Sequence, residues 1–195
     1  MRSVIRRIGI IGGGQLGMFL SQASESIGVR SFVYADVKGA PAEKFASKMF
    51  YGPYDDKKKL EKFSSKVDLL TYEFENISIK ALGGIKKSKI YPPLSSLKIS
   101  QDRELEKTFF SKNKIQHAGI VFLKKQDDIN KCKKINYPVI LKTSRFGYDG
   151  KGQFLVKSFD ELKKQWREID FQSCVVEKVI ELKEEVSIIC AKDIK

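Results

Sequence analysis

The residues best suited to chemistry are a lysine and the glycine-rich loop that follows it. Lys142 closes an apolar run, and five residues later the chain reads Gly147-Tyr148-Asp149-Gly150-Lys151-Gly152-Gln153. Such a loop can present backbone N–H groups and an ammonium group to nucleotide phosphates, while a lysine on an adjacent strand neutralises charge from beneath. These residue types suit phosphoryl transfer. A β-hairpin turn is the simpler alternative, but it does not require three glycines beside Arg145, Lys151 and Lys142.

A second glycine-rich loop follows the apolar run 8–11 and reads Gly12-Gly13-Gly14-Gln15-Leu16-Gly17, which satisfies G-x-G-x-x-G. Glycines permit positive φ, and a helix start offers N–H groups to an anion. Asp36 holds the place of an acid that binds a ribose hydroxyl in dinucleotide-binding proteins. Three interpretations stay open: an anion site, the dinucleotide site of a nicotinamide or flavin enzyme, or tight strand–helix packing without a ligand.

The elements that must position these loops alternate between strands and helices. Apolar periodicity predicts strands at 8–11, 31–34 and 67–74, and helices from Leu16 to Ile27, ended by Gly28, and at 57–64. This alternation predicts a parallel sheet covered on both faces. Pro92 and Pro93 forbid helix continuation, so we place a domain boundary between residues 93 and 94.

The second predicted domain, 94–195, is organised differently. We expect a helix at 102–112 and strands at 139–142, 154–156, 175–177 and 185–191. Ser158 is the predicted N-cap of a helix that carries Leu162 and Trp166, with Glu161 in the capping-box position. Trp166 is expected to belong to the core at this spacing.

Composition and charge narrow the class of protein. With 195 residues, 42% of them hydrophobic, the chain can bury the core of one or two domains. No apolar run reaches the ~18 residues of a membrane span and no cleavable signal is present, so we expect a cytoplasmic protein. The net charge of +13 is spread over many helices and mixed with acids, which favours a solvated surface over a nucleic-acid site. Of the three cysteines, Cys174 and Cys190 are expected to be buried.

Five separated parts of the chain resemble, in order, the N5-carboxyaminoimidazole ribonucleotide synthase family of the ATP-grasp superfamily. These are Gly12–Gly17 (GGGQLG), Thr71–Asn76 (TYEFEN), Gln101–Arg103 (QDR), Lys142 with Gly147–Gln153 (GYDGKGQ), and Glu177–Ile180 (EKVI) with Glu185–Ser187 (EVS). The resemblance implies an α/β fold: a preATP-grasp domain with a Rossmann-like parallel sheet, then the smaller α+β lobe of an ATP-grasp domain. It also implies a carboxylate–amine ligase of purine biosynthesis, which carboxylates 5-aminoimidazole ribonucleotide with ATP and bicarbonate through carboxyphosphate.

The same resemblance assigns roles to individual residues. ATP contacts are implied for Arg103, Lys142, Gly147, Tyr148, Asp149, Gly150, Lys151, Gly152, Gln153, Glu177, Lys178, Val179, Ile180 and Glu185. Tyr148, Asp149 and Lys151 are the implied catalytic residues. Substrate contacts are implied for Gly14, Gln15, Leu16 and Glu73, with the ribonucleotide phosphate near the glycine loop and the aminoimidazole or bicarbonate near Glu73 and Tyr148.

The family continues past Lys195 into a larger lobe that supplies the ligands of Mg²⁺. No metal ligand is therefore expected in this chain, which we expect to be inactive or very weak by itself. An open sheet edge would favour a homodimer or pairing with a complementary fragment. Two alternatives remain: a dinucleotide-dependent oxidoreductase, which leaves Lys142 and Gly147–Gln153 unexplained, and a nucleotide- or nucleic-acid-binding module, supported by charge alone.

Overall fold

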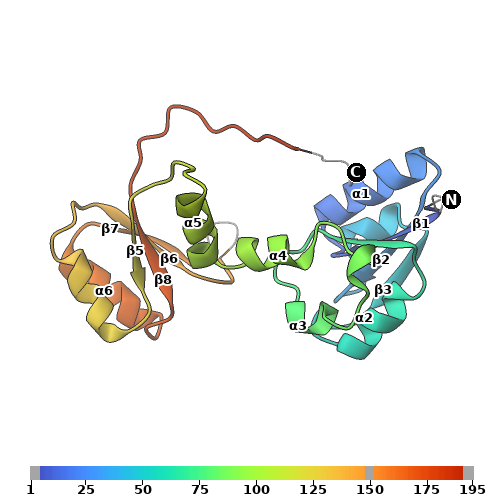
Figure 1. Cartoon of the computed structure of the whole chain (residues 1–195), viewed down its shortest axis with the longest axis horizontal. Helices are drawn as coiled ribbons and strands as arrows, with labels where there is room; N and C mark the ends of the chain where they lie inside the picture. Colours follow the sequence, from blue (N-terminus) through green and yellow to red (C-terminus); the bar gives the residue numbers. More distant parts are fainter. Residues whose placement is uncertain (1–4, 148–151, 191–195) are drawn as a thin grey trace. The chain divides into compact units, whose positions relative to one another are not determined.

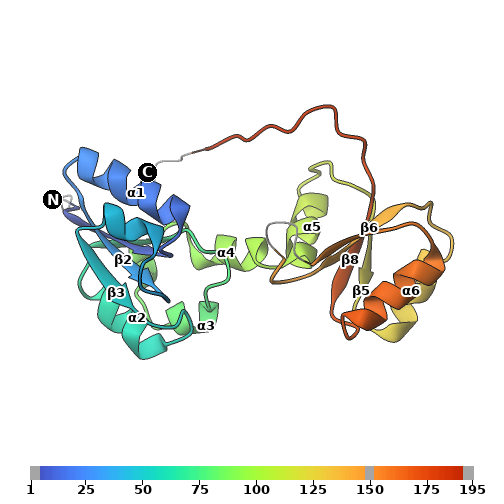
Figure 2. The same ribbon diagram turned by 180° about the vertical axis from the view of Figure 1, so that it is seen from behind.

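The computed structural model describes residues 5–147 and 152–190. Its contacts divide the chain into two compact units, Met1–Phe109 and Phe110–Lys195, which Figures 1 and 2 present from opposite sides. The first contains a parallel sheet and the second an antiparallel sheet. Each unit is accordingly described by itself.

The first unit is built on a parallel sheet with the strand order β3-β2-β1-β4. Its strands are β1 (Arg7–Ile11), β2 (Arg30–Ala35), β3 (Lys48–Tyr51) and β4 (Leu69–Tyr72). β1 is central, with Ile11 opposite Tyr34 on one side and Tyr72 on the other. Because parallel strands end at the same edge, the residues that follow β1 and β4 are neighbours, and Gly12 and Glu73 are among them. The predicted parallel sheet is confirmed.

Helices cover both faces of this sheet (Figure 1). On one face, α1 (Gln15–Ser26) and the 3-10 turn η1 (Pro41–Lys44) cover a small core containing Ile10 and Val33. On the other, a larger core takes side chains from α2 (Lys57–Ser64), α3 (Ile79–Leu82) and α4 (Leu94–Ser100). Neighbouring residues Ile10 and Ile11 enter different cores, as the two-residue period of a strand requires.

The first unit continues beyond the paired prolines. Leu97 of α4 is buried in the larger core of this unit, so the chain stays packed on the first unit after Pro93. Helix α5 (Arg103–Lys112) then carries the chain across the division after Phe109. The domain boundary between residues 93 and 94 stays a prediction.

The second unit contains an antiparallel sheet with the strand order β5-β8-β6-β7. Its strands are β5 (Ile120–Leu123), β6 (Val139–Thr143), β7 (Gln153–Val156) and β8 (Cys174–Lys178). One face packs on α6 (Phe159–Glu168) and on the 3-10 turn η3 (Gln126–Cys132). Trp166 is 2% exposed in this core, which confirms its predicted place, and Cys132 and Cys174 are buried as well.

The last predicted strand, 185–191, is wrong over the part that the structure describes. Residues 181–190 have no helix or strand and are all exposed. Ile189 is 98% exposed, and Cys190, which we expected to be buried, is exposed too. An apolar alternation forms a strand only when a neighbouring strand pairs with it, and no pairing with 185–190 occurs among the described residues.

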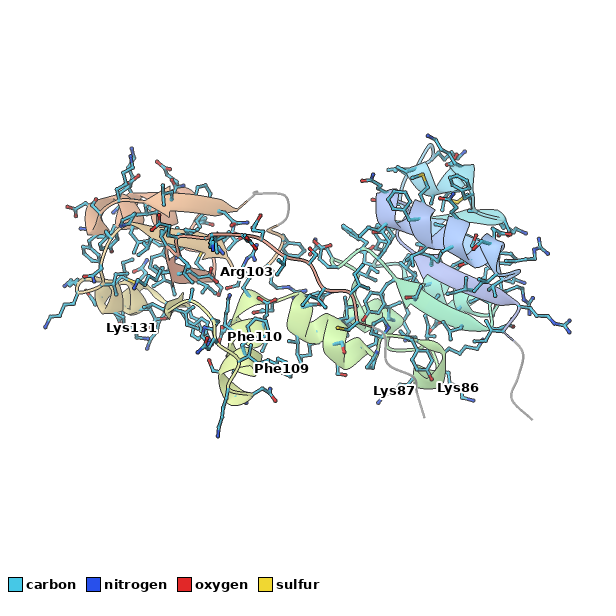
Figure 3. All side chains as sticks on the ribbon, turned by 90° about the horizontal axis from the view of Figure 1, so that it is seen from above. Lys86, Lys87, Arg103, Phe109, Phe110 and Lys131 are labelled. Atoms are coloured by element: carbon cyan, nitrogen blue, oxygen red, sulfur yellow. The ribbon has the colours of Figure 1, made fainter. Side chains whose placement is uncertain are left out.

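Lysines are spread over the surfaces of both units. Lys86 and Lys87 beside η2 (Lys87–Lys89) and Lys131 in η3 are exposed examples (Figure 3). Several exposed lysines pair with acids one helical turn away, as Lys57 does with Glu61 at 3.9 Å. Within the described residues, no helix combines the length and the apolar character needed to cross a membrane.

The N-terminus of α6 is capped as the sequence predicts, with one difference. Ser158 Oγ accepts a hydrogen bond from Glu161 N at 3.2 Å. Glu161 Oε2 accepts from the backbone N–H of Lys157 at 2.8 Å, one residue before the N-cap. The two contacts satisfy N–H groups that the helix itself leaves unpaired.

Replacing Ser158 with alanine removes the cap of the helix that covers the second core. We expect Ser158→Ala to lower the free energy of unfolding by about 1 kcal/mol, measured by urea unfolding. Ser65→Ala is the matched control, because Ser65 Oγ donates to Lys62 O at the exposed end of α2, and its effect should stay within about 0.5 kcal/mol. Equal losses in the two variants would contradict the capping role.

Candidate functional site

The face of the second sheet that points away from α6 carries an ion pair between β6 and β8. Val139, Leu141 and Val176 enter the core, so the intervening Ile140 and Lys142 of β6 and Glu177 of β8 lie on the other face. Lys142 Nζ donates to Glu177 Oε2 at 2.5 Å. The side chains are 19% and 6% exposed. Because both charges are largely shielded from water, their attraction exceeds that of a surface pair.

Apolar side chains lie beside this ion pair. Ile140 is opposite Glu177 on β8 and opposite Leu155 on β7, so the three side chains form a row across this face. Leu155 is 56% exposed. An ammonium group next to an exposed apolar patch suits a ligand with a planar base and a charged tail. The sequence analysis missed Ile140 and Leu155, although their two-residue spacing from Lys142 and Gln153 was a usable signal.

The glycine-rich loop between β6 and β7 is described only at its ends. Gly152 has φ +67°, and a Cβ there would lie 2.4 Å from Thr143 Oγ1. Gly152 O accepts from Thr143 N at 2.9 Å, and Gln153 is opposite Lys142. The loop therefore starts and ends beside Lys142. Tyr148, Asp149, Gly150 and Lys151, including all three predicted catalytic residues, lie outside the described residues.

The predicted hinge begins in β8. Glu177 and Lys178 end this strand, and Val179 and Ile180 follow without regular secondary structure. Lys178 N donates to Gly119 O at 2.9 Å, which ties the hinge to the start of β5. Ile180 is 53% exposed.

The remaining predicted ATP contacts are Glu185 and Arg103. Glu185 lies in the exposed segment 181–190. Arg103 is the first residue of α5 and belongs to the first compact unit, whereas Lys142 belongs to the second. Their roles at the site stay predictions.

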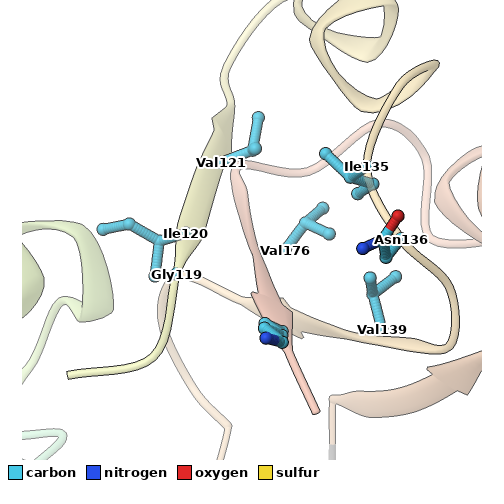
Figure 4. A pocket seen from close by; sticks show the side chains of 8 residues that line it. Gly119, Ile120, Val121, Ile135, Asn136, Val139 and Val176 are labelled. Carbon is cyan, nitrogen blue, oxygen red and sulfur yellow. The ribbon is translucent and has the colours of Figure 1, made fainter.

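A crevice of about 270 Å³ lies on the core side of the same sheet (Figure 4). Its walls are mostly apolar and include Ile120, Val121, Val139 and Val176, with Asn136 and Lys178 as polar members. Val139 and Val176 point away from the face that carries Lys142 and Glu177. The crevice shares Lys178 with the predicted hinge but does not include Lys142 or Glu177.

The first glycine loop holds an acid of the protein itself. Glu73 Oε1 accepts from Gly14 N at 2.9 Å, across 59 residues of sequence. The loop glycines leave room for this contact, since a Cβ on Gly12 would lie 2.6 Å from Glu73 Oε1 and one on Gly17 would lie 2.5 Å from Gly12 O. The group that meets the start of α1 is thus the Glu73 carboxylate of the protein itself. The glycines also allow the close packing that was the third interpretation of this loop.

This environment shifts the pKa of the Glu73 carboxyl. Burial raises its pKa above the ordinary 4.5, assisted by the charge of Glu75 and opposed by hydrogen bonds from the backbone N–H groups of Gly14 and Gly17. Predicted substrate contacts Gly14 and Glu73 are therefore brought together. Gln15 and Leu16 are exposed on the first turn of α1.

A pocket of about 350 Å³ opens beside Glu73 and is also lined by Gly14, Asp36 and Tyr54. Burial, followed by the nearby charge of Asp36, raises the pKa of Tyr54 to about 12. The lining has two carboxylates and no basic side chain. Such a lining favours N–H and O–H donors over phosphate, and it disfavours the dinucleotide pyrophosphate that Asp36 and the glycine pattern had left open.

Metal ligands do not cluster in the described ranges, 5–147 and 152–190. No group of three or more His, Cys, Asp or Glu side chains there is arranged to hold a metal ion.

Family models match two consecutive parts of the chain. The ribonucleotide synthetase preATP-grasp domain matches residues 5–101, and the ATP-grasp domain matches residues 108–195. N5-carboxyaminoimidazole ribonucleotide synthase of Staphylococcus aureus (strain COL) is 36% identical over 183 residues, which are 93% of this chain and 49% of the relative. The Brucella melitensis synthase is 35% identical over 190 residues, 95% of this chain and 52% of the relative. The chain spans about half the length of the curated relatives it matches.

Solved structures of these enzymes have a similar fold. The Staphylococcus aureus N5-carboxyaminoimidazole synthetase complexed with ADP matches with a TM-score of 0.83 and 34% identity, over 91% of this chain and 48% of that one. An ADP complex of another N5-carboxyaminoimidazole ribonucleotide synthetase has a TM-score of 0.84 and 30% identity, over 94% and 50% of the two chains. The fold class inferred from the resemblance is confirmed.

Gly152 offers a test of the loop geometry. We expect Gly152→Ala to lower the free energy of unfolding by about 1–2 kcal/mol, because alanine strains at positive φ and its Cβ would meet Thr143. Gly119→Ala is the matched control, since a Cβ there has only Lys178 Cβ at 4.0 Å nearby, and it should change stability by less than about 1 kcal/mol. Urea unfolding measures both. A neutral Gly152→Ala would contradict the described turn.

Glu73 gives the stability of the chain a pH dependence. The folded chain holds a proton on Glu73 at a pH where the unfolded chain has lost it, so wild-type stability falls as pH rises from about 4.5 through the raised folded pKa. Glu73→Gln removes this titration and should gain stability relative to wild type over that interval, measured by urea unfolding at several pH values. Glu168→Gln, which changes an exposed acid paired with Lys164, should show no such gain. A constant difference between wild type and Glu73→Gln would contradict the raised pKa.

Proposed function

Consecutive parts of the chain match the ribonucleotide synthetase preATP-grasp domain and the ATP-grasp domain, and the chain is similar to about half of the N5-carboxyaminoimidazole ribonucleotide synthases; we therefore propose that it serves the carboxylation of 5-aminoimidazole ribonucleotide. In this reaction bicarbonate takes the γ-phosphoryl group of ATP, which gives carboxyphosphate and ADP. The amine of the ribonucleotide then attacks the carboxyl carbon, and phosphate leaves. The product is N5-carboxyaminoimidazole ribonucleotide, an intermediate of purine biosynthesis.

The observation that carries the proposal is the Lys142–Glu177 ion pair on the face of the second sheet that points away from α6. A polyphosphate bound there meets the Lys142 ammonium, while Glu177 keeps the lysine side chain directed along the sheet. Ile140 and Leu155 offer an apolar surface to the adenine ring, in the same row as Glu177. ADP is bound by two solved relatives that are 30% and 34% identical to this chain. The residues on this face and the ADP complexes of these relatives both support an adenine nucleotide as the ligand.

The remaining nucleotide contacts are proposed from the family pattern. Backbone groups of Glu177 to Ile180 would read the adenine edge, Glu185 would hold the ribose hydroxyls, and Arg103 would contact the phosphates. The loop from Gly147 to Gln153 would close over the triphosphate, with Tyr148, Asp149 and Lys151 next to the reacting groups. Their work would be to orient the two substrates and to stabilise charge in the transition state, which is the main demand of phosphoryl transfer.

For the carboxyl acceptor we propose contacts with Gly14, Gln15, Leu16 and Glu73. The pocket beside Glu73 suits the amine and hydroxyl groups of the acceptor better than its phosphate, because its lining is acidic. This lining favours a position of the ribonucleotide phosphate outside the glycine loop. Glu73 already occupies the N–H group of Gly14, so a phosphate there would have to displace a carboxylate.

Activity of the whole enzyme extends beyond what this chain spans in its relatives. About half of the relatives' length is matched, and we propose that Mg²⁺ ligands and the completion of the nucleotide site come from the other half. A homodimer or a complementary fragment would supply this other half of the site. We place the reaction in the cytoplasm.

Titration with three ligands separates this function from its alternatives. The ligase proposal expects ATP to bind in preference to NAD, whereas an oxidoreductase would prefer NAD. A nucleic-acid-binding module would bind a short DNA duplex with an affinity that falls steeply with salt. Preferred binding of NAD or salt-dependent binding of the duplex would overturn the ligase proposal.

Lys142 is the residue whose removal tests the nucleotide site. We expect Lys142→Met to weaken ATP binding at least about tenfold, because a charge-assisted contact with phosphate is lost. Lys142→Arg should recover part of the affinity. Isothermal titration measures binding, after circular dichroism has shown that each variant is folded.

The matched control is Lys131→Met. Lys131 also pairs with an acid, at 2.6 Å from Asp128, but its side chain is 63% exposed in η3. Its loss should leave ATP affinity within about twofold of wild type, since an exposed pair far along the chain from the site contributes little. If both lysine variants bind ATP as wild type does, the site is not on the face of the sheet that carries Lys142.

A further inference from the structure

Four residues other than glycine have positive φ in the part of the chain that the structure describes: Lys114 (55°), Phe146 (61°), Asp170 (53°) and Phe171 (51°). Three of them follow helices α5 and α6, where their N–H groups donate to carbonyls of the last helical turn. A left-handed residue is a common helix ending. Phe146 instead follows strand β6, so helix capping does not account for its backbone conformation.

The two phenylalanines of this set differ in what their rings contact. Phe171 packs edge-on against the buried Trp166, with ring centroids 5.3 Å apart and an interplanar angle of 85°. Phe146 is 67% exposed, and its ring faces the guanidinium of Arg145 at 5.5 Å. Packing offsets the unfavourable backbone of Phe171, whereas the ring of Phe146 is presented to solvent. Strain held at an exposed side chain is characteristic of functional positions.

The register of the second sheet limits what this ring can meet. Val139 at the start of β6 is opposite Lys178 at the hinge, and Thr143 at its end is opposite Cys174. Phe146 follows Thr143 and is therefore at the end of the sheet away from the hinge. With adenine at the hinge and phosphates at Lys142, as in the proposed function, the γ-phosphate end of ATP points toward Phe146. A ring at this end of the sheet can therefore meet the second substrate and not adenine.

We propose that Phe146 is a substrate-positioning residue that stacks on the aminoimidazole ring of the carboxyl acceptor. Offset stacking of an aromatic side chain on a planar heterocycle orients the ligand without hydrogen bonds. Left-handed φ at Phe146 directs an exposed ring off the end of β6 instead of into a core. The inference rests on the proposed function, because that function supplies the acceptor and the direction of ATP.

Three substitutions separate the ring from the backbone. Phe146→Gly removes the ring and relieves the positive φ, Phe146→Ala removes the ring but keeps the strained backbone, and Phe146→Tyr keeps an aromatic ring. Binding of 5-aminoimidazole ribonucleotide and of ATP is measured by isothermal titration on the full chain, with thermal melting in parallel. We expect Gly and Ala to weaken ribonucleotide binding at least about fivefold, and Tyr to stay within about twofold of wild type. ATP binding should be unchanged in all three.

Phe171→Gly is the matched control, since it also removes a phenylalanine with positive φ. Its ring belongs to the packing around Trp166, so we expect a lower melting temperature and unchanged affinity for both ligands. Phe146→Gly should show the opposite pattern, with a melting temperature equal to or above that of wild type. A structural role for Phe146 would instead lower the melting temperature of the Gly variant.

The outcomes distinguish this inference from the function on which it rests. If wild type binds ATP but the Gly and Ala variants bind the ribonucleotide as tightly as wild type, or if no ribonucleotide binding occurs, the stacking role is overturned and the nucleotide site stands. Weakened ATP binding in the Phe146 variants would also overturn it, because the ring would then act on the nucleotide. If wild type binds neither ligand, the proposed function is overturned as well.

Discussion

The two-residue period of β6 and β8 is the constraint on which the chemistry of the second unit depends. Leu141 and Val176 are buried against α6, and this packing fixes the register of the sheet. A slip by one residue would exchange the faces of a whole strand and would bring the Lys142 ammonium into the core. The apolar core thus determines, from the opposite side of the sheet, that Lys142 meets Glu177. Packing and charge placement are two consequences of one alternation.

The two glycine loops look alike in the sequence and serve different purposes in the structure. In the first, the absence of side chains lets Glu73 reach the N–H group of Gly14, so the positive end of α1 is neutralised by the protein itself. In the second, Gly152 lets the chain turn closely past Thr143 and return to Lys142. A glycine pattern therefore indicates close approach of the backbone to a neighbour. Whether that neighbour is a ligand depends on the residues that the fold brings to it.

Sequence alone predicted the features that depend on local interactions. The unit β1–α1–β2, the Ser158 cap and the buried Trp166 follow from periodicity, turn residues and capping, which act over a few positions. The short strands β3 and β5 were missed, because a run of only three or four apolar or aromatic residues does not distinguish a strand from other buried segments. The strand at 185–191 was predicted from its alternation, but a strand needs a partner. The contact of Glu73 with Gly14 spans 59 residues, so no local pattern contains it, although the family resemblance named both residues.

The ion pair between Lys142 and Glu177 also bears on which ligand this face of the sheet can select. A lysine that already has a carboxylate partner gains little from a singly charged anion, since the new contact competes with one already made at 2.5 Å. A polyphosphate carries several negative charges and can attract the ammonium without displacing Glu177 from it, because different oxygens share the three N–H donors. The free-energy cost of removing these largely buried charges from water is already offset within the fold. The preformed ion pair thus favours a nucleotide, with its chain of phosphates, over a small anion that carries a single charge.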